Sequence, residues 1–283
     1  MLAIIGGTGL YDIEGVELVS ELEIDTPFGT PSAPVKTLRA GERDFLFLPR
    51  HGAGHAFLPH EINYRANIFA LKKAGARMVV GFSAVGSLQQ EIAPGDFSVP
   101  SQYFDLTKGK REHTFFGNGI AAHVSTAIPT CPDLSAWIAD VAGRSNTKLH
   151  IDKTYACVEG PRLGTKAESF FMRGAGCDLV GMTNVPEVFL AREAQLSYAT
   201  ICIATDYDCW LEDPEQHVTV QAVIERFGAS LTKAKELLMQ MLQSPLPQVD
   251  EDYRKALALA MAVLTPDSAL NKGQLSMLEV LRA

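Results

Sequence analysis

The stretch Leu2-Ala3-Ile4-Ile5-Gly6-Gly7-Thr8-Gly9 opens with a short apolar run followed at once by glycines. An apolar run that ends in glycines is typical of a buried strand that turns sharply into a loop. Similar apolar runs recur at residues 45–48, 78–82, 179–182 and 199–205. We therefore expect several buried strands, each leading into a loop of small or polar residues.

The segments between these runs have the spacing of helices. Ile68, Leu71 and Ala74 lie on one face of a helix expected over residues 63–74, and Gly75 stands where that helix would end. Further helices are expected at 166–173, 186–194 and 220–242. Strands that alternate with helices predict an α/β fold with a central, largely parallel or mixed sheet covered on both faces.

One domain is the simplest organisation for this chain of 283 residues. The only stretch with the character of a linker is 244–251, which contains Pro245 and Pro247. A separate unit made of the tail at 248–283 would be too small to be stable. We therefore expect this helical tail to pack on the main body or on a neighbouring subunit.

Composition limits the class of protein. With 47% hydrophobic and 20% charged residues, the chain is not intrinsically disordered. Its 25 Lys and Arg against 33 Asp and Glu argue against nucleic acid as a partner. No apolar stretch reaches the roughly 18 residues of a membrane span, and the first residues are too glycine-rich for a signal peptide. The five cysteines have no CxxC spacing, so we expect no disulfide framework, no zinc site and a cytoplasmic protein.

Three of the expected strands end in residues that can bind an anion. Gly6-Gly7-Thr8-Gly9 offers backbone N–H groups and a hydroxyl, although it is neither a dinucleotide fingerprint nor a Walker loop. Arg50-His51-Gly52, followed by His55, offers a guanidinium, and 83–87 offers two serine hydroxyls. Each motif also has a purely structural interpretation, as a tight turn, a paired arginine or a turn of small residues. Ligands of α/β sheets collect at strand ends, so their convergence favours an anion site.

Two carboxylates follow the strand at 199–205. Asp206 and Asp208 would point to the same side if the chain stays extended, and such a pair could exchange protons, bind a metal or bind an amino-substituted heterocycle. The alternative is a solvated loop that caps the next helix. Glu159-Gly160-Pro161-Arg162 is expected to be only a rigid turn with a Glu–Arg pair.

Ten motifs in a fixed order carry a resemblance to a known family. They are Gly6-Gly7-Thr8-Gly9-Leu10, Asp25-Thr26-Pro27-Phe28-Gly29, Arg50-His51-Gly52, Gly86-Ser87-Leu88, Glu91-Ile92-Ala93-Pro94-Gly95-Asp96, Glu159-Gly160-Pro161-Arg162, Ala167-Glu168-Ser169-Phe170, Met182-Thr183, Val185-Pro186-Glu187-Val188 and Ala204-Thr205-Asp206-Tyr207-Asp208-Cys209-Trp210. Together they resemble the trimeric branch of the purine nucleoside phosphorylase superfamily, and within it they are most similar to the methylthioadenosine phosphorylases.

The resemblance implies a fold, a reaction and partners. The fold would be a single domain with a mixed, partly closed barrel flanked by helices. The reaction would be phosphorolysis of 5′-methylthioadenosine to adenine and 5-methylthioribose 1-phosphate. Inorganic phosphate would be a co-substrate, with no metal and no organic cofactor. The partners would be a purine nucleoside and phosphate, without nucleic acid or membrane, in a homotrimer or a dimer of trimers.

The resemblance also implies roles for individual residues. Phosphate would contact Thr8, Arg50, His51, Ala84 and Thr183, with Ser83 at the junction of phosphate and ribose. Met182 would lie under the ribose and the purine, and Leu163 would contact the base at a position where the family usually has Phe. The 5′ substituent would meet Val220 and Val223, with His55 and His123 nearby.

Asp206 and Asp208 would be the catalytic carboxyls. A protonated Asp206, its pKa raised by burial and by Asp208, would protonate the purine ring as the base leaves. A carboxylate also accepts a hydrogen bond from an exocyclic amine, and 6-oxopurine enzymes of the superfamily have Asn in place of Asp206 and Glu in place of Gly164. Adenine is therefore favoured. A methylthioinosine or 6-oxopurine phosphorylase and an inactive nucleoside-binding protein remain as alternatives.

Overall fold

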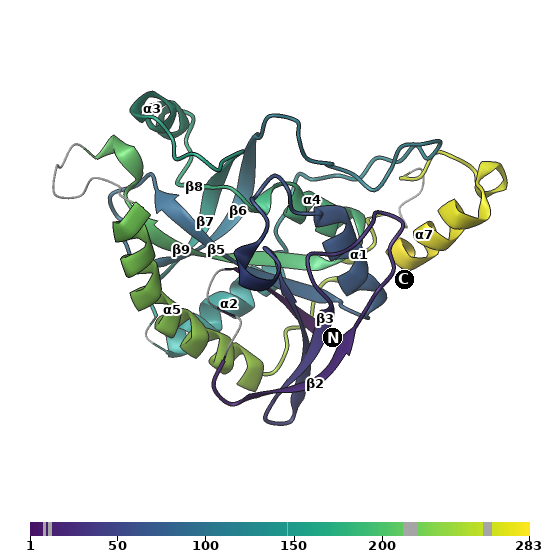
Figure 1. Cartoon of the computed structure of the whole chain (residues 1–283), viewed down its shortest axis with the longest axis horizontal. Helices are drawn as coiled ribbons and strands as arrows, with labels where there is room; N and C mark the ends of the chain where they lie inside the picture. Colours follow the sequence, from purple (N-terminus) through teal and green to yellow (C-terminus); the bar gives the residue numbers. More distant parts are fainter. Residues whose placement is uncertain (8–9, 11–12, 146, 212–219, 257–261) are drawn as a thin grey trace.

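The structure is a computed structural model that describes residues 1–7, 10, 13–145, 147–211, 220–256 and 262–283, without the side chains of 220–227 and 229. Figure 1 shows a central group of strands with helices on both sides and the C-terminal helix at one end.

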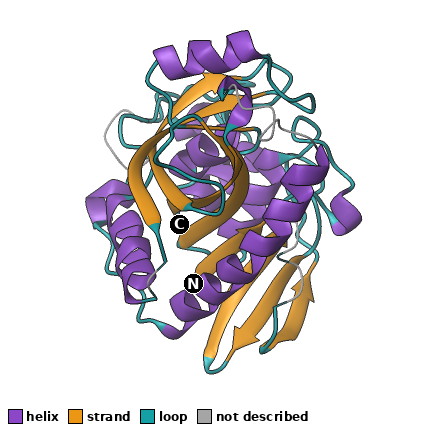
Figure 2. Cartoon of the chain, turned by 90° about the vertical axis from the view of Figure 1, so that its left-hand side faces the viewer, coloured by secondary structure: helices purple, strands orange, loops and turns teal. Residues whose placement is uncertain are grey.

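Nine strands form one sheet. They are β1 (Leu2–Gly6), β2 (Val16–Leu22), β3 (Val35–Ala40), β4 (Arg43–Pro49), β5 (Met78–Ser87), β6 (Phe97–Leu106), β7 (Leu149–Val158), β8 (Leu179–Gly181) and β9 (Ser197–Asp206), in the order β2-β3-β4-β1-β5-β8-β7-β6-β9. Because β5 pairs with β9 as well as with β8, the last five strands in this order close into a barrel. The predicted mixed sheet flanked by helices is confirmed, and the strong curvature of the barrel is visible in Figure 2.

Seven α-helices cover the sheet within the described part of the chain. They are α1 (Tyr64–Lys73), α2 (Pro132–Arg144), α3 (Lys166–Gly174), α4 (Asn184–Glu193), α5 (Val220–Gln243), α6 (Glu251–Arg254) and α7 (Lys272–Arg282). Helices α1, α4 and α7 contribute to one hydrophobic core, and α2 and α5 contribute to another. Both cores pack against strands of the sheet, so helices cover both faces. None of the helices in the described ranges is long and apolar enough to cross a lipid bilayer.

The predicted strands and helices are found near their expected positions, with one clear error. Residues 83–87, expected to be a turn, continue β5, which pairs there with β8 and β9. Their small side chains allow the strands of the closed barrel to approach: a Cβ on Gly86 would lie 3.1 Å from Val180 and 3.2 Å from Asp206 Oδ1.

Strands β2, β3, β6 and β7 were not among the expected strands, and the reason is clearest for β6. Proline is rare inside strands because it cannot donate to the ladder. Pro100 lies within β6, and the pairing of β6 with β7 shifts register on both sides of it. The strand therefore accommodates the proline at an irregularity, which a pattern of alternating residues does not reveal.

The tail packs on the body of the same chain. Met277, Leu278 and Leu281 of α7 are buried in the core that contains α1. Leu278 is fully buried there. The organisation of the chain as one domain stays a prediction.

Candidate functional site

The ends of several strands open into one cavity of about 770 Å³. Strands β4, β1 and β5 are adjacent and parallel, and β9 runs parallel to β5, so their C-terminal ends meet at one edge. Of the predicted site residues, the cavity is lined by Arg50, His51, His55, Ser83, Ala84, Leu163, Met182, Thr183, Asp206 and Asp208. The predicted convergence of strand ends is therefore present, and Gly7 of the first glycine motif also lies at this cavity. Thr8 lies outside the described residues.

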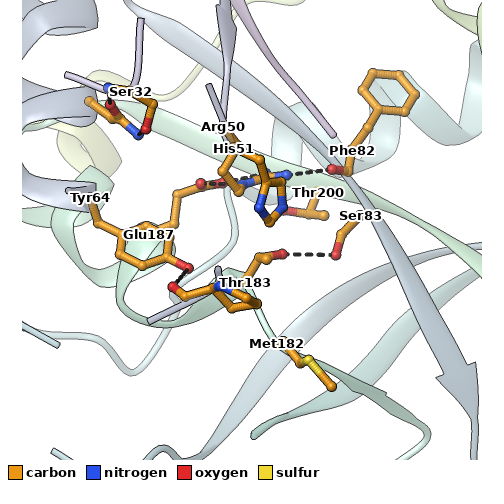
Figure 3. Close-up of polar contacts among 12 residues, drawn as sticks. Ser32, Arg50, His51, Tyr64, Phe82, Ser83, Met182, Thr183, Glu187 and Thr200 are labelled. Atoms are coloured by element: carbon orange, nitrogen blue, oxygen red, sulfur yellow. Dashed lines mark hydrogen bonds and ion pairs between the residues drawn. The ribbon is translucent and has the colours of Figure 1, made fainter. Parts of the chain in front are cut away.

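Arg50 lies at the end of β4 and its side chain is 1% exposed. Its Nε and Nη2 donate to the two carboxylate oxygens of Glu187, each at 2.7 Å, and Nη1 donates to the Phe82 carbonyl oxygen at 2.7 Å (Figure 3). Burial opposes the guanidinium charge, but the adjacent Glu187 carboxylate raises the pKa of Arg50 above its ordinary value. The structural interpretation of Arg50 as a paired arginine and its interpretation as an anion-binding group therefore both hold in part, because it forms a buried ion pair and also lines the cavity.

Glu187, the partner of Arg50, is held by a chain of hydroxyls. The Tyr198 hydroxyl donates to Glu187 Oε1 at 2.7 Å, and its oxygen lies 2.5 Å from Thr200 Oγ1. A tyrosine hydroxyl has a single hydrogen, so Thr200 must be the donor to Tyr198. All three residues are buried. The sequence analysis did not assign a role to Glu187. The feature that could have indicated one is that Glu187 is an acidic residue among the apolar residues of α4 and has no basic residue within four positions of it.

His51 is neutral at physiological pH. Burial lowers the pKa of His51 to about 4, and the Arg50 charge beside it acts in the same direction. Its Nδ1 lies 2.9 Å from the Phe57 carbonyl oxygen, which only accepts, so Nδ1 carries the proton. In the neutral ring Nε2 is then an acceptor. The ring stacks on His55, with 4.0 Å between the ring centroids.

Two hydroxyls meet at the same end of the cavity as Arg50. Ser83 Oγ of β5 lies 3.0 Å from Thr183 Oγ1, which precedes α4 (Figure 3). The Thr183 N–H donates to the Tyr155 hydroxyl at 3.4 Å. Hydroxyls and guanidinium N–H groups are suitable donors to an anion, so the geometry fits an oxyanion at this end.

The two carboxylates line the cavity, but not on an extended chain. Asp206 is the last residue of β9, and Asp208 begins a 3₁₀ turn with φ of 46°, so the expectation of an extended pair is wrong. The turn brings the Asp208 N–H to Asp206 Oδ1 at 2.7 Å. The Thr205 hydroxyl lies 2.7 Å from Asp206 Oδ2. Burial raises the pKa of Asp208 above its usual value; the raised pKa expected for Asp206 stays a prediction.

Glu159-Gly160-Pro161-Arg162 forms a turn, but its charges do not pair with each other. Glu159 Oε1 accepts from Arg111 Nε at 2.8 Å, whereas Arg162 pairs with Glu168 at 2.5 Å. Gly160 has φ of 68°, a conformation that favours glycine. The predicted Glu159–Arg162 pair is therefore wrong, because the turn directs Arg162 toward α3.

Arg111 is the second functional candidate that the sequence did not reveal. Its side chain is 1% exposed. Nη1 donates to the carbonyl oxygens of Met182 and Val185 at 2.7 and 2.6 Å, and Nη2 donates to that of Glu159 at 3.0 Å. Arg111 thus connects the segment that carries Met182 and Thr183 to the turn at Gly160, and both segments line the cavity.

The predicted pocket for the 5′ substituent is only partly described. His55 lines the cavity, whereas His123 is exposed and is not among the residues that line it. The side chains of Val220 and Val223 lie outside the described residues. Among the residues that are described, no group of three or more His, Cys, Asp or Glu side chains could hold a metal ion.

Comparison with known proteins identifies the family. Residues 1–243 match the model of the phosphorylase superfamily. S-methyl-5′-thioadenosine phosphorylase from Geobacter sulfurreducens is 42% identical over 95% of this chain and 93% of its own length. The enzyme of the same name from Hyperthermus butylicus is 47% identical over 88% of this chain and 90% of its own length.

Solved structures agree with these relatives. A methylthioadenosine phosphorylase from an antarctic soil metagenomic library has a TM-score of 0.89 at 38% identity and covers 99% of this chain and 98% of its own. Methylthioadenosine phosphorylase from Schistosoma mansoni in complex with adenine has a TM-score of 0.81 at 38% identity, over 86% of this chain and 90% of its own. The chain therefore belongs to the phosphorylase superfamily, in the family of the S-methyl-5′-thioadenosine phosphorylases.

Proposed function

We propose that this protein is a pentosyltransferase that uses inorganic phosphate to cleave S-methyl-5′-thioadenosine into adenine and 5-methylthioribose 1-phosphate. The observation that carries the proposal is a single cavity with anion-binding groups at one part of its wall and two carboxyls at another. Arg50, Ser83 and Thr183 supply the first, and Asp206 and Asp208 supply the second. The names of relatives that cover most of this chain support the same activity.

Phosphate binds beside Arg50, His51, Ser83, Ala84 and Thr183. The neutral His51 can accept a hydrogen bond from a phosphate hydroxyl at Nε2, while the guanidinium and the two side-chain hydroxyls donate to the other oxygens. As the glycosidic bond lengthens, positive charge develops on the ribose. Phosphate stabilises this charge and then bonds to the anomeric carbon.

The leaving base is neutralised by a proton. Asp206, in its protonated form, donates to nitrogen 7 of the purine as the ring accepts the electrons of the breaking bond. Asp208 lies beside it and contributes to recognition of the base. Leu163 and Met182 contact the base and the ribose, and His55 lies beside the methylthio group. No metal ion or organic cofactor takes part.

Rates on three nucleosides test the substrate. Release of adenine from methylthioadenosine must require phosphate and must exceed the release of base from methylthioinosine and inosine. The carboxyl oxygens of Asp206 and Asp208 that carry no proton accept from a 6-amino group and face a 6-oxo group as like acceptors, which supports this ranking. If inosine were the best substrate, the adenine assignment would be wrong. Nucleoside binding without turnover would instead indicate an inactive binding protein.

The finer assignments are further parts of the proposal. The protein is a cytoplasmic homotrimer or dimer of trimers, and it serves purine and methionine salvage. It binds a purine nucleoside and phosphate rather than nucleic acid or a membrane. Light scattering on the purified protein distinguishes a monomer, a trimer and a hexamer. Full activity after dialysis against a metal chelator tests the absence of a metal.

A further inference from the structure

The phosphate end of the cavity has an unusual balance of charge. Arg50 is the only charged side chain among the described residues that we propose to contact phosphate. Glu187 balances its charge through two hydrogen bonds of 2.7 Å. His51 is uncharged because burial lowers its pKa to about 4. The remaining contacts come from Ser83, Ala84 and Thr183, which carry no charge. A doubly negative anion would therefore enter a site rich in donors with little net positive charge.

We infer that Glu187 is a positioning residue that keeps this site electrically neutral, so that bound phosphate retains its negative charge for the ribose cation of the transition state. This inference rests on the proposed phosphorolysis. Glu187 is not among the residues that line the cavity, so it acts through Arg50 and not by touching phosphate.

The contacts of Arg50 allow it to orient phosphate while its charge is compensated. Glu187 occupies Nε and one N–H of Nη2, and Phe82 occupies one N–H of Nη1, so one N–H on each terminal nitrogen of Arg50 is not used in these contacts. These remaining N–H groups can orient an anion by hydrogen bonding. The carboxylate beside them cancels the long-range field of the guanidinium, which would otherwise weaken the attraction between phosphate and the ribose cation.

The Glu187 carboxylate is itself held in one position. It is 1% exposed, receives the Tyr198 hydroxyl at 2.7 Å, and lies in a bidentate pair with Arg50. A buried pair of this kind is costly to desolvate and is weak evidence for a role in stability. A role in tuning the charge next to a bound anion explains why the acid is placed there.

The inference predicts an unusual kinetic result for Glu187→Gln. The glutamine carbonyl oxygen can take the Oε1 position, where it accepts from the Tyr198 hydroxyl and from Arg50 Nη2. Its NH₂ group then replaces Oε2, so Arg50 Nε loses its acceptor while the other two contacts remain. The site gains one unit of positive charge. We expect the KM for phosphate to fall about tenfold and kcat for methylthioadenosine to fall by about tenfold or more, because the extra cation favours free phosphate binding and opposes the ribose cation.

A merely structural role predicts a different pattern. Loss of Arg50 positioning would raise the KM for phosphate, and that result would overturn the inference. Tyr198→Phe is the matched control: it removes a hydrogen bond to Glu187 but no charge, so it must not lower the KM for phosphate. Wild-type turnover is measured first, since absence of phosphorolysis would refute the proposed function and not the charge argument.

A second measurement uses the wild-type protein and does not depend on the folding of a variant. A cationic iminoribitol imitates the charged ribose, and calorimetry gives its affinity with and without phosphate. If bound phosphate keeps its negative charge, phosphate must increase the affinity for the iminoribitol by about tenfold or more. The iminoribitol must then increase the affinity for phosphate by the same factor. Equal affinities in the two titrations would refute the inference.

Discussion

Replacing Asp206 by asparagine exchanges a proton donor for an amide of the same shape. In the structure the Asp208 N–H donates to Asp206 Oδ1 at 2.7 Å, so the asparagine oxygen must take that position. Its NH₂ group then faces Thr205 Oγ1, which lies 2.7 Å from the present Oδ2. The Thr205 hydroxyl can accept from this group and turn its own hydrogen to the Val85 carbonyl oxygen at 3.2 Å.

Every buried group thus keeps a partner, and the free energy of unfolding should change by less than about 1 kcal/mol. The effect on catalysis should be much larger. General acid catalysis contributes roughly 10²- to 10⁴-fold, or about 3–5 kcal/mol of activation free energy. We expect kcat/KM for methylthioadenosine to fall within this range, because the asparagine amide has no acidic proton to give to the departing base.

The ranking of substrates is the sharper measurement. The asparagine NH₂ can donate to a 6-oxo group but faces the 6-amino group with like donors, which costs about 1–3 kcal/mol. The ratio of kcat/KM for methylthioinosine to that for methylthioadenosine should therefore rise at least about tenfold. Spectroscopic assays of base release on both nucleosides give this ratio.

The matched control is Asp140→Asn, the same chemical change in an exposed ion pair with Arg144 on α2. It should leave the rates and their ratio unchanged. If Asp206→Asn keeps the wild-type ratio of kcat/KM for the two nucleosides, the carboxyl does not discriminate between the 6-amino and 6-oxo bases. If it also keeps the wild-type rate on methylthioadenosine, Asp206 is not the acid.

Three further substitutions test other parts of the structure. Burial raises the pKa of Glu193 to about 7 in the folded protein, above its value in the unfolded chain. The folded state therefore binds the proton more tightly, and the free energy of unfolding falls by roughly 3 kcal/mol as the pH rises from about 4.5 through 7. Glu193→Gln should remove this slope, as measured by urea unfolding at about pH 5 and about pH 7.5. Arg111→Ala should destabilise the fold by about 3–5 kcal/mol in the same assay, because it leaves Glu159 buried without its partner. Gly81→Ala places a Cβ 2.9 Å from the Tyr198 hydroxyl oxygen and 3.1 Å from Arg50 Nη2, so it displaces the Arg50–Glu187–Tyr198 network and the KM for phosphate should rise by about tenfold or more. An unchanged KM would show that phosphate binding does not require Arg50 to be held in this position.

Much of the sheet could be predicted because its strands are buried on both faces. Strand β9 is buried along its whole length, from Ser197 to Asp206, and its apolar run at 199–205 is correspondingly clear. Strand β2 is mostly exposed, and β6 is buried only in its first four residues, of which Pro100 is the last. Their sequences therefore resemble loops, and the closure of the barrel depends on pairing that no local pattern encodes.

The residues that line the cavity were easier to predict than the residues that support them. Arg50, Ser83 and Asp206 are polar groups at or near the ends of apolar runs, which is a local signal. The groups behind them are distant in sequence: Glu187 is separated from Arg50 by 137 positions, and Arg111 from Glu159 by 48. Sequence proximity instead favoured the incorrect pair of Glu159 with Arg162.

A more general rule would have found these supporting residues without assigning their partners. A charged side chain surrounded by apolar residues cannot be buried alone, because its desolvation must be compensated by an opposite charge or by several hydrogen bonds. Glu187 stands among apolar residues of α4, so the sequence indicates that a buried cation or a set of hydrogen-bond donors faces it. Both Arg50 and Arg111 qualify on charge. Only the folded chain shows which arginine pairs with Glu187. The Glu187 carboxylate faces Arg50 at the end of β4. Arg111 instead binds the carbonyl oxygens of Met182, before α4, and Val185, in its first turn.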